Sequence, residues 1–213
     1  MEESYIRELE IESISKVLRF HQKLEGDVSC VVWDAAIVLA KYLETLCQTN
    51  TKFLVNKNVI ELGAGVGCVG ITAACLGANV LLTDLPVAIP LMSKNVETNK
   101  VAWQQSQGNV ETMTLTWGEE ANIKCSPDII LLTDCVYYKE SIDSLVITLK
   151  ELAMDDTTIF LTQELRDTEK QKNCWEYFVN HIKDYFEFHL VPREEQNPEF
   201  NSADIVLIKL VKI

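Results

Sequence analysis

The chain has 213 residues, of which 47% are hydrophobic and 24% charged, a composition typical of one globular domain with a sizeable core. Its formal net charge of −13 argues against a nucleic-acid partner, because binding to a phosphate backbone needs clustered lysine and arginine. No apolar run reaches membrane-spanning length, and the acidic start, Met1 to Ser4, lacks the apolar region of a signal peptide, so we expect a cytoplasmic protein without a membrane partner.

Two predicted strands open the chain. Apolar and charged residues nearly alternate over residues 5–22, with a break near Ser13 to Ser15, which indicates a β-hairpin. Residues 33–47 carry apolar side chains at helical spacing and predict a helix. Because no repeat, low-complexity tract or Pro/Gly/Ser linker interrupts the chain, we expect one domain over residues 1–213, with residues 1–32 as a hairpin extension.

Short apolar strands and helices alternate after the first helix. The predicted strands cover residues 59–62, 79–83, 111–117, 129–133, 157–162, 185–191 and 203–210. The predicted helices cover residues 67–76, 87–99, 140–152 and 168–183. This order favours an α/β fold, a doubly wound and mostly parallel seven-stranded sheet with helices on both faces. The last two strands have no helix between them and should be antiparallel neighbours.

A glycine-rich turn, Glu61-Leu62-Gly63-Ala64-Gly65-Val66-Gly67, follows the first of these strands. Glycines allow positive φ and a close approach of the backbone to a ligand. Gly65-x-Gly67-x-x-Gly70 matches the dinucleotide fingerprint, whereas Glu61 to Gly67 resembles the motif of enzymes that bind S-adenosylmethionine (SAM). Glu61 favours SAM, because a buried acid needs a partner that a cationic methionyl group or loop N–H groups would supply. A turn without a ligand is the remaining alternative.

Two further residues are predicted at the carboxyl ends of strands, where ligands bind in such sheets. Asp84 comes about twenty residues after the glycine turn, a spacing at which an acid binds a ribose. Its alternative role is to cap the next helix. Trp117, followed by Gly118, could stack on an adenine or simply pack in the core.

Asp134 ends the fourth strand of the alternating series and is followed by Tyr137 and Tyr138. A carboxylate beside aromatic rings suits an amine substrate, through a charge-assisted hydrogen bond and an aromatic wall. Capping of the next helix and core packing are the alternatives. Trp33 taken alone indicates core packing, and Arg166 taken alone a solvated charge.

The cysteines and histidines do not indicate a metal site. Seven cysteines occur without a Cys-x-x-Cys pair, and three histidines show no ligand spacing. We therefore expect reduced, mostly buried thiols.

Five segments occur together and in order, which identifies a family resemblance: Cys30 to Ala36, Glu61 to Gly67, Thr83 to Leu85, Leu115-x-Trp117-Gly118 and Asp134-x-x-Tyr137. Together they resemble the methyltransferase-like 21 family of seven-β-strand protein-lysine methyltransferases. The resemblance covers nearly the whole chain. It is strongest, over residues 31–39 and 41–45, to members that methylate valosin-containing protein, a hexameric AAA ATPase.

The resemblance implies a Rossmann-like methyltransferase with SAM as cofactor and S-adenosylhomocysteine as product. The residues implied for cofactor binding are Trp33, Glu61, Gly63, Ala64, Gly65, Asp84, Trp117 and Thr133, although the family has alanine at the position of Thr133. Asp134 and Tyr137 are implied as the catalytic pair in a lysine channel. Tyr138 and Arg166 are expected to bind the substrate, the latter because Glu164-Leu165-Arg166 resembles a Glu-x-Arg element of the family.

The implied partner is a protein, valosin-containing protein or another ATPase or chaperone, and we expect the enzyme to be a monomer. Three alternatives remain at this point. They are an NAD-dependent oxidoreductase, which would lack an evident catalytic relay, a non-catalytic interaction module, and a methyltransferase for another protein or a small amine.

Overall fold

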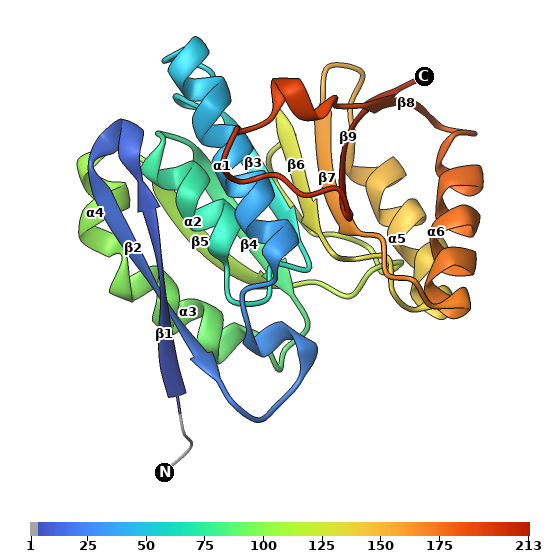
Figure 1. Cartoon of the computed structure of the whole chain (residues 1–213), viewed down its shortest axis with the longest axis horizontal. Helices are drawn as coiled ribbons and strands as arrows, with labels where there is room; N and C mark the ends of the chain where they lie inside the picture. The colour runs from blue at the N-terminus through green and yellow to red at the C-terminus, as the bar shows by residue number, and fades with distance from the viewer. Residues whose placement is uncertain (1–3) are drawn as a thin grey trace.

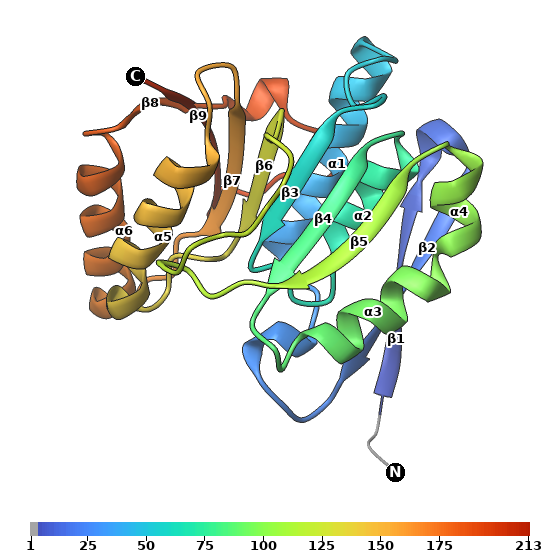
Figure 2. The same ribbon diagram turned by 180° about the vertical axis from the view of Figure 1, so that it is seen from behind.

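A seven-stranded sheet forms the centre of the computed structural model, which describes residues 4–213 (Figures 1 and 2). Its strands are β3 (Asn58–Leu62), β4 (Asn79–Asp84), β5 (Asn109–Thr114), β6 (Ile129–Thr133), β7 (Thr158–Glu164), β8 (Phe186–Leu190) and β9 (Ile205–Lys212). Their order is β5-β4-β3-β6-β7-β9-β8, in which β3 to β7 are parallel and β9 runs antiparallel to both β7 and β8. The predicted sheet, with an antiparallel last strand, is confirmed.

Helices cover both faces of this sheet. On one face lie α1 (Asp34–Thr49), α2 (Cys68–Cys75), α3 (Ile89–Thr98) and α4 (Lys100–Gln105). On the other face lie α5 (Lys139–Leu152) and α6 (Glu169–Ile182). Across residues 4–213, none of the helices combines the length and the apolar character needed to span a bilayer.

The central strands have apolar side chains on both faces because alternate residues point to opposite sides. In β3, Val59 belongs to the core under α1 and α2, whereas Ile60 belongs to the core under α5 and α6. In β6, Leu131 and Leu132 divide in the same way. This double burial fixes the strands and therefore the position of the loops that follow them.

The predicted hairpin is formed by β1 (Ser4–Ile11) and β2 (Lys16–Lys23), a separate two-stranded sheet. Two side-chain amides bind the open edge of β2, that of Asn95 in α3 and that of Asn99 between α3 and α4. The Asn95 amide accepts from His21 N and donates to His21 O, and the Asn99 amide does the same with Arg19, at 2.7–3.1 Å. The hairpin is therefore held against the helical layer, and β1 keeps its outer edge.

Two segments differ from the prediction. A short helix, α4, follows the predicted helix over residues 87–99, in a segment for which no element was predicted. It forms because the backbone of Asn99 (φ −100°, ψ 9°) ends α3 and buried Trp103 holds a second short helix on the core. The strand predicted over residues 111–117 ends at Thr114, where its neighbour β4 also ends. Trp117 therefore lies in the loop after β5.

Candidate active site

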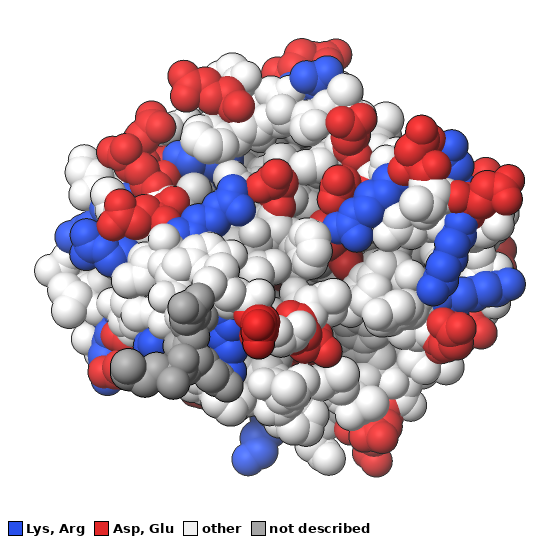
Figure 3. Space-filling view, turned by 60° about the horizontal axis from the view of Figure 1, so that its bottom comes forward, with Lys and Arg blue, Asp and Glu red and all other residues white. Residues whose placement is uncertain are grey.

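A cavity of about 570 Å³ lies at the carboxyl ends of β3, β4 and β6 and against the start of α1, a volume within the range of small-molecule sites. The order of the strands reverses between β3 and β6, which is the usual ligand position in such sheets. Every predicted site residue except Glu61 lines this cavity: Trp33, Gly63, Ala64, Gly65, Asp84, Trp117, Thr133, Asp134, Tyr137, Tyr138 and Arg166. Figure 3 views this end of the sheet and shows Asp and Glu side chains around a hollow with few charges.

The glycine turn forms the floor of the cavity. Gly63 and Gly65 both have positive φ, 65° and 54°. A Cβ on Gly63 would lie 3.0 Å from both the Trp117 ring and the Cys135 sulfur, so glycine lets the turn fit under the indole. The Gly65 N–H donates to Asp84 Oδ2 at 2.7 Å, which ties the turn to the end of β4.

Glu61 lies beneath the turn and not in the cavity, which corrects the predicted contact with a cofactor. It is 1% exposed, and its Oε2 accepts from the Gly70 N–H at 2.7 Å. Burial raises the pKa of this carboxyl to about 8, against the effect of the Gly70 hydrogen bond. A Cβ on Gly70 would lie 2.7 Å from Glu61 Oε2. Gly70 therefore makes room for this acid, which accounts for the third glycine of the dinucleotide-like pattern.

Asp84 and Trp117 both line the cavity next to the glycine turn. Asp84 does not cap α3, whose N-cap residue is Ala88. Its carboxylate accepts from Gly65 N and from Leu85 N, and burial raises its pKa. Trp117 is partly buried against the core under α5. The two side chains offer hydrogen-bond acceptors and an aromatic face to one ligand.

Asp134 has one carboxylate oxygen that accepts no hydrogen bond from residues 4–213. Its backbone is left-handed (φ 50°), which turns the side chain inward, and the residue is 8% exposed. Oδ1 accepts from Glu164 N at 2.8 Å and from the Gln163 side-chain amide at 3.0 Å. Oδ2 is buried and has no hydrogen-bond partner within residues 4–213. Asp134 does not cap α5, whose N-cap residue is Tyr138.

Charged and aromatic groups surround this oxygen. Burial raises the pKa of Asp134, while the Glu164 N–H and the Arg166 guanidinium oppose the shift. Arg166 lies 4.9 Å from the centre of the Trp33 indole and donates to Glu164 at 2.9 Å. These contacts bring Trp33 and Arg166, which taken alone indicated core packing and a solvated charge, to the wall of the cavity.

The two tyrosines pack together, with ring centres 4.5 Å apart. Burial raises the pKa of Tyr137 to about 12, so its hydroxyl stays protonated at neutral pH. Tyr138 is 49% exposed and forms part of the rim.

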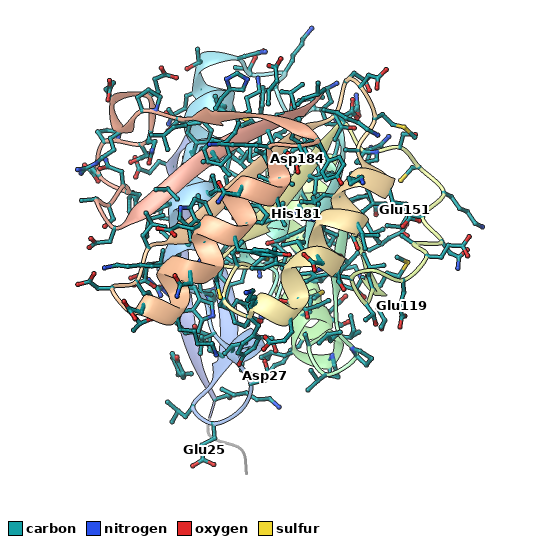
Figure 4. All side chains as sticks on the ribbon, turned by 90° about the vertical axis from the view of Figure 1, so that its right-hand side faces the viewer. Glu25, Asp27, Glu119, Glu151, His181 and Asp184 are labelled. Carbon is teal, nitrogen blue, oxygen red and sulfur yellow. The ribbon has the colours of Figure 1, made fainter. Side chains whose placement is uncertain are left out.

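Two residues that line the cavity were not predicted from the sequence. Gln163 is 5% exposed, and its amide joins Asp134 to the Val136 N–H. A polar residue directly after an apolar strand was the available signal. Ser29, in a short 3-10 helix (Val28–Cys30), lines the cavity with a buried hydroxyl that no described group bonds. Figure 4 shows the neighbouring Asp27 on the loop that passes below the helices at this end.

The cysteines agree with the sequence prediction, since all seven are free and five of them are buried. Within residues 4–213, no group of three or more His, Cys, Asp or Glu side chains could hold a metal ion.

The chain was compared with known proteins. A family model described as "Lysine methyltransferase" matches residues 12–184. The chain is 43% identical over 141 residues to Protein N-lysine methyltransferase METTL21A of Danio rerio, which covers 65% of this chain and 62% of that protein. It is 35% identical over 169 residues to EEF1A lysine methyltransferase 3 of Xenopus tropicalis, covering 79% and 70% respectively. The chain thus spans less than two thirds of the METTL21A protein that it matches.

Among solved structures, the chain is similar to the T. Thermophilus 16S rRNA N2 G1207 methyltransferase RsmC, in complex with AdoMet and guanosine. The TM-score is 0.64 and the identity 17%, over 99% of this chain and 51% of that one. The glycopeptide N-methyltransferase MtfA gives a TM-score of 0.60 and 11% identity, over 80% of this chain and 90% of that one. At these identities the similarity concerns the fold, and it confirms the predicted Rossmann-like methyltransferase architecture.

Proposed function

From the premise that this chain belongs to the lysine methyltransferase family, we propose that it transfers a methyl group from SAM to a lysine side chain of another protein. One observation supports this proposal above the others. A buried carboxylate oxygen of Asp134, without a partner in residues 4–213, lies in the wall of a cavity whose floor is the glycine turn. A lysine nitrogen is a donor that could fill this vacancy in hydrogen bonding.

The residues present fit SAM. The glycines at 63 and 65 leave space that a Cβ would fill, so the backbone of the turn can approach the methionyl part. Asp84 supplies acceptors for the two ribose hydroxyls, and Trp117 supplies an aromatic face for the adenine. Trp33, Ala64 and Thr133 complete the wall. Glu61 acts indirectly, by binding the Gly70 N–H in the first turn of α2, directly after the glycine turn.

SAM, when bound, supplies a methyl group activated by the sulfonium. A neutral lysine amine would bond to this methyl carbon as the carbon–sulfur bond breaks, and S-adenosylhomocysteine would leave. A free lysine has a pKa of about 10.4, so the amine must first lose a proton, which passes to water. The apolar part of the cavity disfavours the ammonium form. Asp134 aligns the amine through Oδ2, and Tyr137 offers a hydroxyl and an aromatic face to the developing positive charge. Arg166 and Tyr138 border the route to this point.

We propose valosin-containing protein as the first candidate substrate, on the similarity over residues 31–39 and 41–45. Another ATPase, a chaperone, or the EEF1A named for one relative would be consistent with the same site. We further propose that the enzyme is a cytoplasmic monomer.

The test is incubation of the purified chain with radiolabelled SAM and three purified proteins: valosin-containing protein, EEF1A and a heat-shock chaperone. Incorporation at a lysine, located by mass spectrometry, is the expected result. Thermal unfolding with SAM, S-adenosylhomocysteine or NADH runs in parallel, because a ligand of the native state raises the melting temperature. Stabilisation by NADH alone would indicate an oxidoreductase. Stabilisation by SAM without methylation of any of the three proteins would indicate another substrate class or an interaction module.

A further inference from the structure

A second groove, which we call the hairpin groove, lies beside the cavity. It has a volume of about 450 Å³ and is lined by Tyr5, Ile6 and Arg7 of β1, Gln22 of β2, and Glu164 at the end of β7. The groove thus joins the N-terminal hairpin to the sheet, and the family motifs do not include the residues that the hairpin contributes to it.

The hairpin groove and the cavity meet at one wall. Val31, Val32 and Trp33 line both of them. Glu164 lines the groove, and it accepts from Arg166, whose Nη2 lies 3.8 Å from Asp134 Oδ2. A chain lying in the groove could therefore pass a side chain around Trp33 toward Asp134.

Gln22 lines the hairpin groove and has a side-chain nitrogen that donates no hydrogen bond to residues 4–213. It is 2% exposed, and its Oε1 accepts from the Val32 N–H at 2.6 Å. Its Nε2 has no hydrogen-bond partner within residues 4–213. A buried amide nitrogen normally has an acceptor, and a peptide carbonyl is the commonest acceptor that a protein ligand can offer.

The hairpin also offers a strand edge. Asn95 in α3 and Asn99 at its C-cap cover the open edge of β2, so β1 has the remaining edge of this two-stranded sheet. An extended peptide can add to such an edge by main-chain hydrogen bonds.

The charge of the cavity next to the groove favours a basic segment. In the groove itself each acid is paired with an arginine, Asp34 with Arg7 at 3.0 Å and Glu164 with Arg166 at 2.9 Å. Four acidic and one basic side chains line the cavity, and two acidic and one basic line the hairpin groove. Two apolar side chains of β1, Tyr5 and Ile6, are 41% and 50% exposed beside these acids. A small anionic molecule would meet the wrong charge here.

We propose that the hairpin groove binds an extended, positively charged segment of the substrate protein next to the target lysine, an inference that rests on the proposed methyltransferase function. The hairpin then helps to select the substrate, whereas the cavity binds the cofactor and the lysine side chain. Recognition of the flanking sequence depends on β1 and Gln22, and catalysis does not.

The test compares two substitutions on the same hairpin. Ile6→Arg places a cation in the groove, and Val17→Arg places one on β2 at a residue of similar exposure, 46%, that lines neither hollow. Methyl transfer is measured with whichever of valosin-containing protein, EEF1A or the chaperone the unmodified chain methylates fastest. We expect Ile6→Arg to raise KM for the protein substrate at least ten-fold, with the dissociation constant for SAM within two-fold. Val17→Arg should have the same KM for the protein substrate and the same dissociation constant for SAM as the unmodified chain.

The outcomes separate the two proposals. Methylation by the unmodified chain, with equal KM for Ile6→Arg and Val17→Arg, would overturn the role of the groove and leave the proposed function standing. An unmodified chain that methylates none of the three proteins would overturn the function as proposed, and the groove's role with it. SAM binding by both variants, measured calorimetrically, shows that each is folded.

Discussion

The guanidinium Nη2 of Arg166 lies 3.8 Å from Oδ2 of Asp134, close enough for electrostatic attraction but too far for a hydrogen bond. Oδ2 therefore keeps its acceptor capacity although a cation stands beside it. The hydrogen bond to Glu164 and the contact with the Trp33 ring hold the Arg166 guanidinium at this distance from Asp134. The guanidinium charge opposes the rise in the pKa of Asp134 that burial causes, and the spacing leaves a gap that an amine could enter.

Asp134→Asn should nearly abolish methyl transfer without preventing cofactor binding. Asparagine tolerates the left-handed backbone that Asp134 adopts and keeps an oxygen for the Glu164 N–H, so the local structure should persist. The negative charge that aligns the amine is lost, and we expect kcat to fall on the order of 100-fold or more. Calorimetry should give a dissociation constant for SAM within about three-fold of the original, a range that corresponds to less than 1 kcal/mol. Full turnover by the variant would show that Asp134 does not align the substrate.

Much of this site could be predicted from the sequence because each part follows a strand. The parallel strands β3, β4 and β6 bring Gly63, Asp84 and Asp134 to one edge, and these strands were predictable as short apolar runs alternating with helices. Side-chain direction could not be predicted in the same way. Glu61 was recognisable as a buried acid, but whether its carboxylate meets a ligand or the Gly70 N–H depends on how α2 packs on β3.

Contacts between distant segments were also outside the reach of the sequence. The hairpin is held by the side-chain amides of Asn95 in α3 and Asn99 at its C-cap, and no local pattern reports this pairing. Similarly, α4 separates from α3 only through the backbone of Asn99.

Trp117→Ala should weaken SAM binding by roughly 10- to 100-fold, since stacking of a base on an aromatic ring contributes about 1–3 kcal/mol. The matched control is Trp175→Ala. Trp175 is also partly buried in the core under α5 and α6, with its ring centre 5.8 Å from that of Phe178, and it does not line the cavity. Calorimetric titration with SAM measures both variants. Equal losses of affinity would show that Trp117 acts through the core and not by stacking.

Two lysine–glutamate pairs, each three residues apart in the sequence, should differ sharply in their contribution to stability. Lys41 and Glu44, 2.9 Å apart, both have side chains that are 2% exposed, whereas Lys100 and Glu97, 3.0 Å apart, are 43% and 71% exposed. Glu44→Gln keeps an acceptor for the Ser13 N–H at the hairpin turn but removes the buried negative charge beside Lys41. The Glu12 carboxylate, 3.6 Å away, and the Phe200 ring, 4.8 Å away, remain near the Lys41 ammonium. We expect a loss of about 3 kcal/mol in the free energy of unfolding, and less than about 0.5 kcal/mol for Glu97→Gln.

Urea unfolding with unchanged m-values measures both differences. If Glu44→Gln proved as harmless as Glu97→Gln, the buried pair would not be what ties the hairpin turn to α1.

Glu61 should make the chain less stable as the pH rises toward 8. Burial raises the pKa of this carboxyl from its ordinary value of 4.5 to about 8. Between these values the folded chain holds a proton that the unfolded chain has released, so the free energy of unfolding falls as pH rises, by up to about 1.4 kcal/mol per pH unit. This contribution is complete below pH 4.5 and is lost as pH passes through 8.

Glu61→Gln removes this titration while it keeps an oxygen for the Gly70 N–H. Urea unfolding of both proteins without cofactor, at fixed salt between pH 5 and 8, isolates the effect, because Asp84 and Asp134 titrate in both and cancel in the difference. We expect the stability of the unmodified chain to fall more steeply than that of the variant over this interval. Parallel curves would mean that Glu61 is ionised in the folded protein, and that the Gly70 N–H stabilises its charge enough to offset burial.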